Sequence, residues 1–338
     1  MDRPGVLAER HGYDRRVPRE PIVHPGWCVN LVEAARILPQ ERVLVVVDEP
    51  LVEEGAQLAD TLRTARAEPR LELWAAPERP MAQAPPTVLD AARDSAVCLF
   101  LAEEPLGEEA GARAELGDTM LEVGGREIYL GRVNGELLRG ELSEPAPDLA
   151  EPAAALLAQL EGCKTVRIRG RAGTDLTLRV AGRPWLTDAA PLEPGDFANF
   201  PGGEIYVAPH RDGADGVLVA DLTVPYTVDG LVDEPVTLRF EAGRVVSIDG
   251  GRAADLLREL VDSAGTGADV VAELGLGLNP AVRPRGHVML DEKAARTAHV
   301  AIGRNTGSYG GDNESSIHVD MIFSEPELEA DGRSVRLP

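Results

Sequence analysis

Short apolar segments alternate with amphipathic stretches over residues 41–103, and this alternation constrains the fold more than any other feature. The run ERVLVVVDEP (residues 41–50) is continuously apolar and ends in turn-forming residues, as a buried parallel strand does. The segment LVEEGAQLADTLRTARA predicts an amphipathic helix, and RLELWAAP predicts the next strand. VLDAARDS and AVCLFLAEE then repeat helix and strand. The pattern predicts a small, doubly wound α/β domain with a parallel sheet.

The first crossover of this predicted sheet lacks the glycine-rich motifs of nucleotide-binding proteins. Neither GxGxxG nor GxxxxGK[ST] occurs there. We therefore expect no nucleotide site in this part of the chain. A GxSxG motif, typical of serine hydrolases, is also missing from the sequence.

The pattern of predicted strands and helices changes near residue 150. This change predicts a domain boundary, with an α/β domain over residues 1–150 and a second domain over residues 151–338. The proline- and alanine-rich segment before it includes a predicted helix over residues 153–160. From KTVRIRG onward, short strands alternate with turns that contain Gly, Pro and Asp, and GRAADLLRELVDSAG predicts one helix among them. The second half is therefore expected to be an α+β, metal-binding domain with a mixed, largely antiparallel sheet.

The overall charge and the cysteines limit the possible partners and compartments. A formal charge of −23 over 338 residues disfavours nucleic acid and anionic membranes as partners, although it is compatible with metal ions. Three widely spaced cysteines form no disulfide framework, which indicates a reducing compartment. The N-terminal segment lacks the apolar core of a signal peptide, and no apolar run is long enough to span a membrane. We expect a cytoplasmic protein.

The stretch DNESSIHVDMIF (residues 312–323) has the period of a β-strand and contains two polar residues on one face. Apolar residues alternate with His318 and Asp320, so the imidazole and the carboxylate project from the same side of the strand. Burying these two groups in an apolar segment is unfavourable unless another group compensates.

Three more polar residues lie in apolar or glycine-rich segments of the second half: Glu204, Glu273 and His299. Taken singly, each of the five has an ordinary structural explanation, such as a hydrogen-bonded core histidine. Together, two histidines and three carboxylates form the ligand set expected for zinc, manganese, cobalt or iron. A bound divalent ion would remove the cost of burying three anionic groups in one place.

Four segments, in the order GGEIYVAP, AELGLGLNP, LDEKAARTAHVAIG and NESSIHVDMIF, resemble the M29 peptidase family of metalloaminopeptidases, the AmpS and thermophilic aminopeptidase T type. The resemblance covers roughly residues 199–324. It implies that the same five residues bind two divalent ions (Zn, Co or Mn) and that the chain removes N-terminal residues from peptides. It also implies a homo-oligomer, a dimer or higher.

An aminopeptidase mechanism would give further roles to residues in and near the site. Glu273 or Glu204 is the general base, and the sequence does not separate base from ligand. His210 and Arg211, in the loop after the Glu204 strand, either bind substrate or form an exposed turn. Lys293 either orients a substrate carbonyl or pairs with Glu292.

Two departures from the family pattern favour a second function. The family places a tyrosine seven residues after the histidine of the HxAxG segment, where this chain has Thr306, although Tyr309 is close by. The chain is also shorter than those peptidases. The resemblance extends to an iron(II)-dependent dioxygenase that opens the ring of 2,5-dihydroxypyridine, in which one Fe(II) would be held by two histidines and one carboxylate, here His299, His318 and Asp320.

The presence of both glutamates favours the binuclear hydrolase over the mononuclear dioxygenase. A third possibility is a metal-dependent binding protein without turnover. That protein would contain bound metal, but it would neither release amino acids nor consume oxygen.

Overall fold

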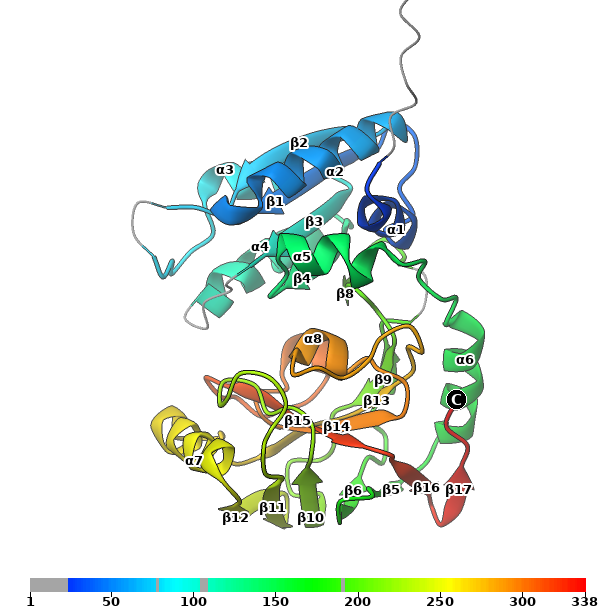
Figure 1. Ribbon diagram of the computed structural model, residues 1–338, viewed down its shortest axis with the longest axis vertical. Helices are drawn as coiled ribbons and strands as arrows, with labels where there is room; N and C mark the ends of the chain where they lie inside the picture. The colour runs from blue at the N-terminus through cyan, green and yellow to red at the C-terminus, as the bar shows by residue number, and fades with distance from the viewer. Residues whose placement is uncertain (1–23, 77–78, 104–108, 190–191) are drawn as a thin grey trace, which may run out of the picture.

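The computed structural model describes residues 24–76, 79–103, 109–189 and 192–338. A parallel sheet with helices on both faces lies above two antiparallel sheets (Figure 1). In this described part of the chain, no helix combines the length and the apolar character that crossing a bilayer requires. The predicted absence of a signal peptide concerns residues 1–23, which lie outside the described residues.

The parallel sheet has five strands in the order β2-β1-β3-β4-β8. Every neighbouring pair is parallel, so each connection must cross over a face of the sheet. The strands are β1 (Arg42–Val47), β2 (Glu68–Leu73), β3 (Val97–Ala102), β4 (Arg126–Gly131) and β8 (Phe197–Asn199).

Helices cover both faces of this sheet because its central strands are apolar on both sides. Val43, Val45 and Val47 of β1 face one apolar cluster, whereas Leu44 and Val46 face another. Helices α1 (Gly26–Ala34), α2 (Val52–Thr64) and α5 (Gly135–Arg139) pack in the first cluster, and α3 (Pro86–Arg93) and α4 (Ala110–Glu122) in the second. Two short 3-10 helices, η1 (Glu49–Leu51) and η3 (Glu141–Ser143), lie among these elements. The predicted parallel α/β unit is thereby confirmed.

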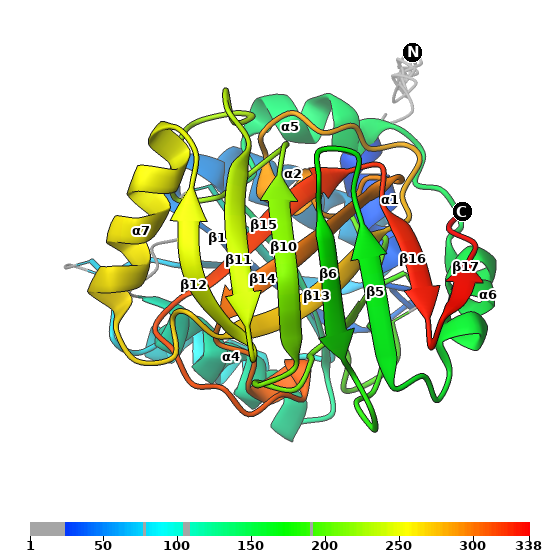
Figure 2. The ribbon, with the colours of Figure 1, turned by 90° about the horizontal axis from the view of Figure 1, so that it is seen from below.

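The second half forms two antiparallel sheets that pack face to face (Figure 2). The seven-stranded sheet has the order β12-β11-β10-β6-β5-β16-β17. Its strands are β5 (Thr165–Arg169), β6 (Asp175–Arg179), β10 (Ala214–Ala220), β11 (Val236–Glu241), β12 (Arg244–Asp249), β16 (Glu327–Ala330) and β17 (Arg333–Val335). Helices α6 (Ala150–Leu160) and α7 (Arg252–Ala264) lie at opposite edges of this sheet.

The five-stranded sheet, in the order β15-β14-β13-β9-β7, lies between the seven-stranded sheet and the α/β unit. Its strands are β7 (Leu186–Thr187), β9 (Glu204–Val207), β13 (Val271–Gly277), β14 (Thr297–Gly303) and β15 (His318–Ser324). Alternate residues such as Leu274, Val300 and Met321 enter one apolar core shared with the seven-stranded sheet. The opposite face of these strands is therefore left to carry other side chains.

Helix α8 (Val288–Asp291) connects this sheet to the α/β unit. It packs against β15, and its Leu290 belongs to the apolar cluster of β1 and β3. A further 3-10 helix, η4 (Gly307–Tyr309), precedes β15. The face of the five-stranded sheet that is directed away from the seven-stranded sheet is its outer face. These contacts place that face in the interior of the molecule.

The predicted α+β character of the second half, with largely antiparallel strands, is confirmed, as are the helices α6 and α7. The structure differs in having two sheets there, and in returning the chain to the parallel sheet through β8. This return depends on pairing between residues about 70 positions apart, for which local periodicity carries no signal. The boundary at residue 150 stays a prediction.

The three cysteines, Cys28, Cys98 and Cys163, are free and buried, in keeping with the absence of a disulfide framework in the sequence. Each occupies the place of a small apolar residue within a packed core.

Glu127 of β4 is an acidic residue buried in the second apolar cluster. It is paired with Cys98 across the strands, it is 5% exposed, and its Oε2 accepts no hydrogen bond within the described structure. Burial raises the pKa of Glu127 from 4.5 to about 8. The folded state thus favours the protonated acid, and its contribution to stability is fully present below pH 4.5 and is lost as the pH rises through about 8.

We predict that Glu127→Gln raises the free energy of unfolding at pH 8–9 by a few kcal/mol, on the order of 1.4 kcal/mol per unit of pKa shift, and changes it little at pH 4–5. Denaturant unfolding across this pH range measures the difference. The exposed Glu122 of α4 offers a matched control, since Glu122→Gln should follow the wild type at every pH. Parallel pH profiles for Glu127→Gln and the wild type would contradict the prediction.

Candidate metal site

The five residues expected to bind metal lie on four neighbouring strands of the five-stranded sheet. Glu204 is on β9, Glu273 on β13, His299 on β14, and His318 and Asp320 on β15. In each strand they alternate with residues of the apolar core, for example Ile205, Leu274, Val300 and Val319. All five side chains therefore project from the face directed toward the α/β unit.

Strand register brings these positions together through small residues. Ala301 lies between Glu273 and Asp320 across the strands, and Gly303 lies opposite His318. Gly275 of β13 lies between Tyr206 and His299. Small residues between the polar ones leave room for the longer side chains to converge.

Gly275 is required for the position of the His299 ring. A Cβ atom at Gly275 would lie 2.0 Å from Cε1 and 2.2 Å from Nε2 of His299. His299 belongs to a buried β-strand and is itself 1% exposed, so its ring is packed in the interior. The imidazole therefore lies directly over the glycine backbone, in a space that any other residue would fill.

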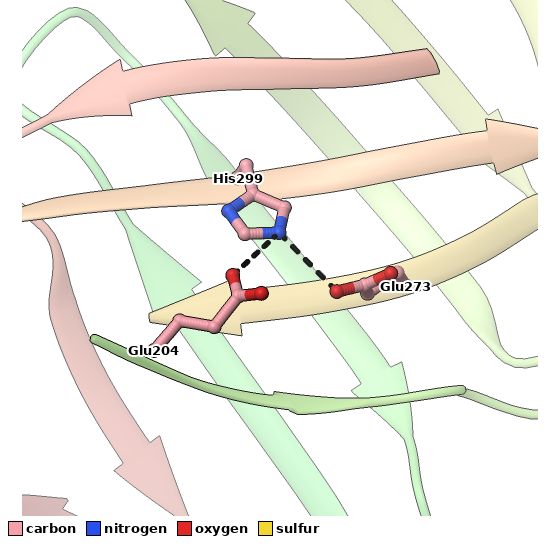
Figure 3. A group of neighbouring side chains, drawn as sticks. All are labelled: Glu204, Glu273 and His299. Atoms are coloured by element: carbon pink, nitrogen blue, oxygen red, sulfur yellow. Dashed lines mark hydrogen bonds and ion pairs between the residues drawn. The ribbon is translucent and has the colours of Figure 1, made fainter. Parts of the chain in front are cut away.

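Glu273 lies between the two histidines and faces each with a different oxygen atom. Figure 3 shows its contact with His299. Its Oε1 is 3.3 Å from Nε2 of His299, and its Oε2 is 3.4 Å from Nε2 of His318. A carboxylate whose two oxygens face two imidazoles has the arrangement of a ligand shared by two ions.

Glu204 and Asp320 complete the cluster on either side. Glu204 Oε2 is 3.5 Å from Nε2 of His299, and Asp320 Oδ1 is 3.2 Å from Nε2 of His318 and 3.9 Å from that of His299. The donor atoms form two groups with Glu273 in common: Glu204, Glu273 and His299, and Glu273, His318 and Asp320. Within each group the donor atoms lie within 4.8 Å of one another.

The orientation of His318 is fixed by a backbone contact. Its Nδ1–H donates to the carbonyl oxygen of Arg304, 2.6 Å away. In the neutral ring, this hydrogen bond leaves Nε2 unprotonated and directed at the carboxylates, as in histidines that bind metals. The Nδ1 atom of His299 is buried without a hydrogen-bond partner within the described residues.

The carboxylates stabilise positive charge in this cluster. Burial alone would lower the pKa of His299, but the hydrogen bond to Glu273 and the charges of Glu204 and Asp320 raise it to about 9. Burial likewise opposes ionisation of Asp320, yet His318 lowers its pKa to about 2. A metal ion would supply the same positive charge, and its binding would release the protons from the imidazoles.

These residues fit a divalent transition-metal ion. Two imidazole nitrogens and three carboxylates are suitable donors, and they come from buried strands that hold them in place. The Oε2 atom of Glu204 is buried and accepts no hydrogen bond from the described residues, so it is available as a ligand.

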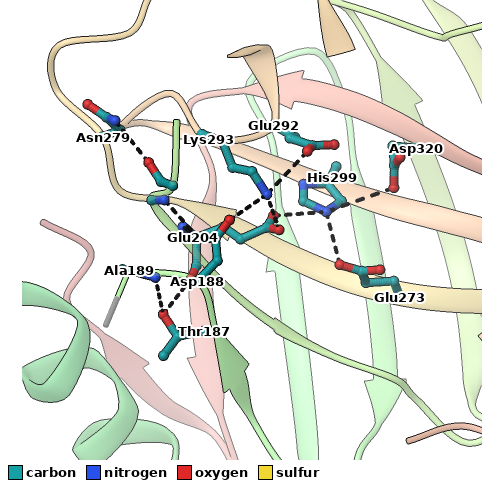
Figure 4. A network of polar contacts seen from close by, with 12 residues as sticks. Thr187, Asp188, Ala189, Glu204, Glu273, Asn279, Glu292, Lys293, His299 and Asp320 are labelled. Atoms are coloured by element: carbon teal, nitrogen blue, oxygen red, sulfur yellow. Dashed lines mark hydrogen bonds and ion pairs between the residues drawn. The ribbon is translucent and has the colours of Figure 1, made fainter. Parts of the chain in front are cut away.

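Lys293 lies beside this cluster and is fully buried (Figure 4). Its Nζ forms ion pairs with Glu204 Oε1, with Asp188 Oδ2 at 2.9 Å and with Glu292 Oε1 at 3.2 Å. Asp188 also accepts hydrogen bonds from the backbone N–H groups of Gly203 and Glu204, both at 2.8 Å.

Sequence reasoning missed Asp188 and the contact of Lys293 with Glu204. Asp188 follows a strand of two residues, too short to be recognised from its pattern. The pair of Lys293 with Glu292 was one of two alternatives, and the structure contains that pair. The rarity of lysine, with only Lys164 and Lys293 in the whole chain, was the one available signal.

Tyr309 lies next to the cluster. Its ring centroid is 4.9 Å from that of His318 and 5.9 Å from that of Tyr206. Thr306, at the family position of the tyrosine, accepts a hydrogen bond from Arg304 at 3.2 Å. Tyr309 therefore lies beside His318, and its predicted contact with substrate stays a prediction.

His210 and Arg211 follow β9 at the end opposite to Glu204. The Nε2 atom of His210 bonds to the carbonyl oxygen of Ala181 at 2.8 Å, and Arg211 is exposed. Their predicted contact with substrate stays a prediction.

Comparison with known proteins places these observations in a family. Residues 148–337 match the Peptidase_M29 family, described as thermophilic metalloprotease (M29). This range includes both antiparallel sheets and all five residues of the cluster.

Two characterised relatives match part of the chain. Aminopeptidase T of Thermus aquaticus is 33% identical over 181 residues, which are 47% of this chain and 43% of that protein. The 2,5-dihydroxypyridine 5,6-dioxygenase of Pseudomonas putida KT2440 is 25% identical over 210 residues, 57% of this chain and 58% of that protein. The chain thus spans about half the length of the curated relatives it matches.

Solved structures share the fold. The 2,5-dihydroxypyridine dioxygenase of Pseudomonas putida KT2440 aligns with a TM-score of 0.73 over 92% of this chain and 94% of its own, at 20% identity. AmpT from Thermus thermophilus aligns with a TM-score of 0.64 over 93% of this chain and 99% of its own, also at 20% identity. From the match over residues 148–337, the chain belongs to the M29 family of metalloproteases.

Proposed function

We propose that this chain is a metal-dependent aminopeptidase that uses two divalent ions, zinc, cobalt or manganese, to hydrolyse the N-terminal peptide bond of its substrates. The position of Glu273 carries the proposal, because its two oxygens face two different histidines and it belongs to both groups of donors. Such a shared carboxylate supports two adjacent ions more directly than one. Family membership and the similarity to aminopeptidase T agree with it.

The five clustered residues would hold the ions, and the protein would add proton transfer. Bound divalent ions supply Lewis acidity for a scissile carbonyl and lower the pKa of water. Glu273 has both oxygens directed at histidines, whereas Glu204 keeps one oxygen without a hydrogen bond. We therefore assign Glu273 the shared ligand role and Glu204 the role of general base: its Oε2, when it is not bound to an ion, would take a proton from water and pass it to the leaving amine.

Tyr309 would orient the substrate beside the histidines. Although the charge of His318 opposes the shift, burial and nearby carboxylates raise the pKa of Tyr309, so its hydroxyl keeps its proton and donates a hydrogen bond. This assignment gives Tyr309 the place that the family pattern gives to a tyrosine at position 306. His210 and Arg211 remain candidates for contacts with more distant parts of a peptide.

The proposal extends to a cytoplasmic protein that acts as a dimer or higher homo-oligomer. The helices described here include none able to cross a bilayer. Light scattering measures the molar mass in solution and therefore the number of subunits.

A ring-cleaving dioxygenase with one Fe(II) is the second candidate. It is favoured by Asp320, whose Oδ1 faces both His299 and His318 and so completes a set of two histidines and one carboxylate. The match to the 2,5-dihydroxypyridine dioxygenase also extends over more of this chain than the match to aminopeptidase T does. In this function Glu204 and Glu273 would lie outside the ligand set.

We predict that the purified chain, loaded with Zn²⁺, Co²⁺ or Mn²⁺, binds about two ions and releases p-nitroaniline from amino-acid p-nitroanilides. It should consume no oxygen with 2,5-dihydroxypyridine after loading with Fe²⁺. Metal analysis, absorbance and an oxygen electrode measure the three quantities. One iron per chain with oxygen uptake would establish the dioxygenase instead, and bound metal without either reaction would indicate a binding protein.

The histidines provide a matched pair of variants for this experiment. His318→Ala should lose bound metal and at least about a hundredfold in kcat/KM, since even indirect partners of metal ligands contribute 10- to 100-fold. His210→Ala makes the same substitution outside the cluster and should keep the metal content of the wild type. Full metal content in His318→Ala would show that His318 is only a core residue.

We further predict that Gly275→Ala lowers the affinity for Mn²⁺ at least about tenfold, because the added methyl group would displace the His299 ring. Calorimetric titration of the metal-free protein measures this affinity. Gly111→Ala is the control, since a Cβ atom there meets no other atom within 4 Å. Unchanged affinity in Gly275→Ala would mean that His299 does not bind the ion.

A further inference from the structure

Lys293 places a fixed positive charge at one side of the cluster and not at the other. Its Nζ forms an ion pair with Glu204, a member of one group of donors. Its other ion pairs, with Asp188 and Glu292, lie outside both groups. In the described structure, none of the three members of the second group, Glu273, His318 and Asp320, is within ion-pair distance of Lys293.

The ammonium group is held firmly in this position. Lys293 is 0% exposed, and its backbone carbonyl accepts a hydrogen bond from the N–H of Asn279 at 2.8 Å. Asn279 in turn donates from Nδ2 to the carbonyl of Gly202, two residues before Glu204. These backbone contacts fix the start of the Lys293 side chain near Glu204, and the ion pairs with Asp188 and Glu292 hold its ammonium group beside that carboxylate.

The contact affects Glu204 as a ligand in two ways. The ammonium occupies Oε1, so only Oε2 remains for a metal ion. A buried positive charge next to the carboxylate also repels a second cation, and this repulsion is weakly screened because both Lys293 and Glu204 are buried.

We propose that the two groups of donors bind divalent ions with unequal affinity and that Lys293 causes the inequality. The group of Glu273, His318 and Asp320 binds the first ion tightly. The group of Glu204, Glu273 and His299 binds the second ion weakly, because Lys293 competes for Glu204. This inference rests on the proposed metal-binding function and deepens it by ordering the two positions.

Lys293→Met tests the inference, because methionine keeps much of the length of the side chain and removes its charge. Calorimetric titration of the metal-free full chain with Mn²⁺ should show two binding events in the wild type, separated by at least about tenfold in affinity. In Lys293→Met, the affinity of the second event should rise at least about tenfold, while that of the first changes less than about threefold. Lys164→Met, at the other, exposed lysine, should match the wild type.

Equal affinities in the wild type, or equal changes of both affinities in Lys293→Met, would overturn the inference while leaving the proposed aminopeptidase intact. One binding event in both proteins would also overturn it. No Mn²⁺ binding in either protein would instead refute the proposed metal-dependent function, so the two failures are distinguishable.

A second variant covers the case in which Lys293→Met does not fold without its counter-charge. Glu204→Gln removes a donor from the weak group and leaves Asp188 and Glu292 to pair with Lys293. It should abolish the weak event and preserve the tight one. Loss of the tight event in Glu204→Gln would overturn the proposed order of binding.

Discussion

The clustering of three largely buried carboxylates on one face of a β-sheet is the constraint on which the rest of this structure depends. Glu204 and Glu273 are buried, Asp320 is partly buried, and all three carboxylates lie within 3.9 Å of Nε2 of His299, where like charges repel and little water is present. Such a cluster persists only if positive charge lies among the carboxylates. Two histidines and Lys293 provide it in the protein alone, and divalent ions provide it more strongly when bound.

The fold satisfies this constraint because the two faces of the five-stranded sheet have different roles. The inner residues of β13, β14 and β15 complete an apolar core with the seven-stranded sheet, which fixes the strands in position. The outer residues include the five candidate ligands, and α8 packs against β15 on one side and against the α/β unit on the other. Rigid strands thereby set the distances between donors, and the glycine at position 275 gives the His299 ring the space it needs.

Local sequence patterns predicted a large part of this arrangement. The alternation in residues 317–323 placed His318 and Asp320 on the same face of one strand, and the alternation of strand and helix in residues 41–103 predicted the parallel sheet. Polar residues in otherwise apolar strands indicated four of the strands that meet at the site. Side-chain period and composition are local properties, so a single sequence shows them directly.

The remaining features depend on contacts between distant residues. The approach of Lys293 to Glu204 joins positions 89 residues apart, and Asp188 reaches the same place from a two-residue strand. The shared position of Glu273 follows from strand register, which a sequence does not specify without its partners. These contacts decide how the five candidate ligands are arranged, whereas the residue types of the five are visible in the sequence itself.

Anomalous X-ray scattering from crystals of the full chain grown with Zn²⁺ or Mn²⁺ tests the central claim most directly. Data collected on either side of the metal absorption edge locate the ions without assumptions about activity. The account predicts anomalous density at about 2.0–2.3 Å from Glu273 and from at least one of the two histidines. Density elsewhere in the molecule, with none at the five clustered side chains, would contradict it.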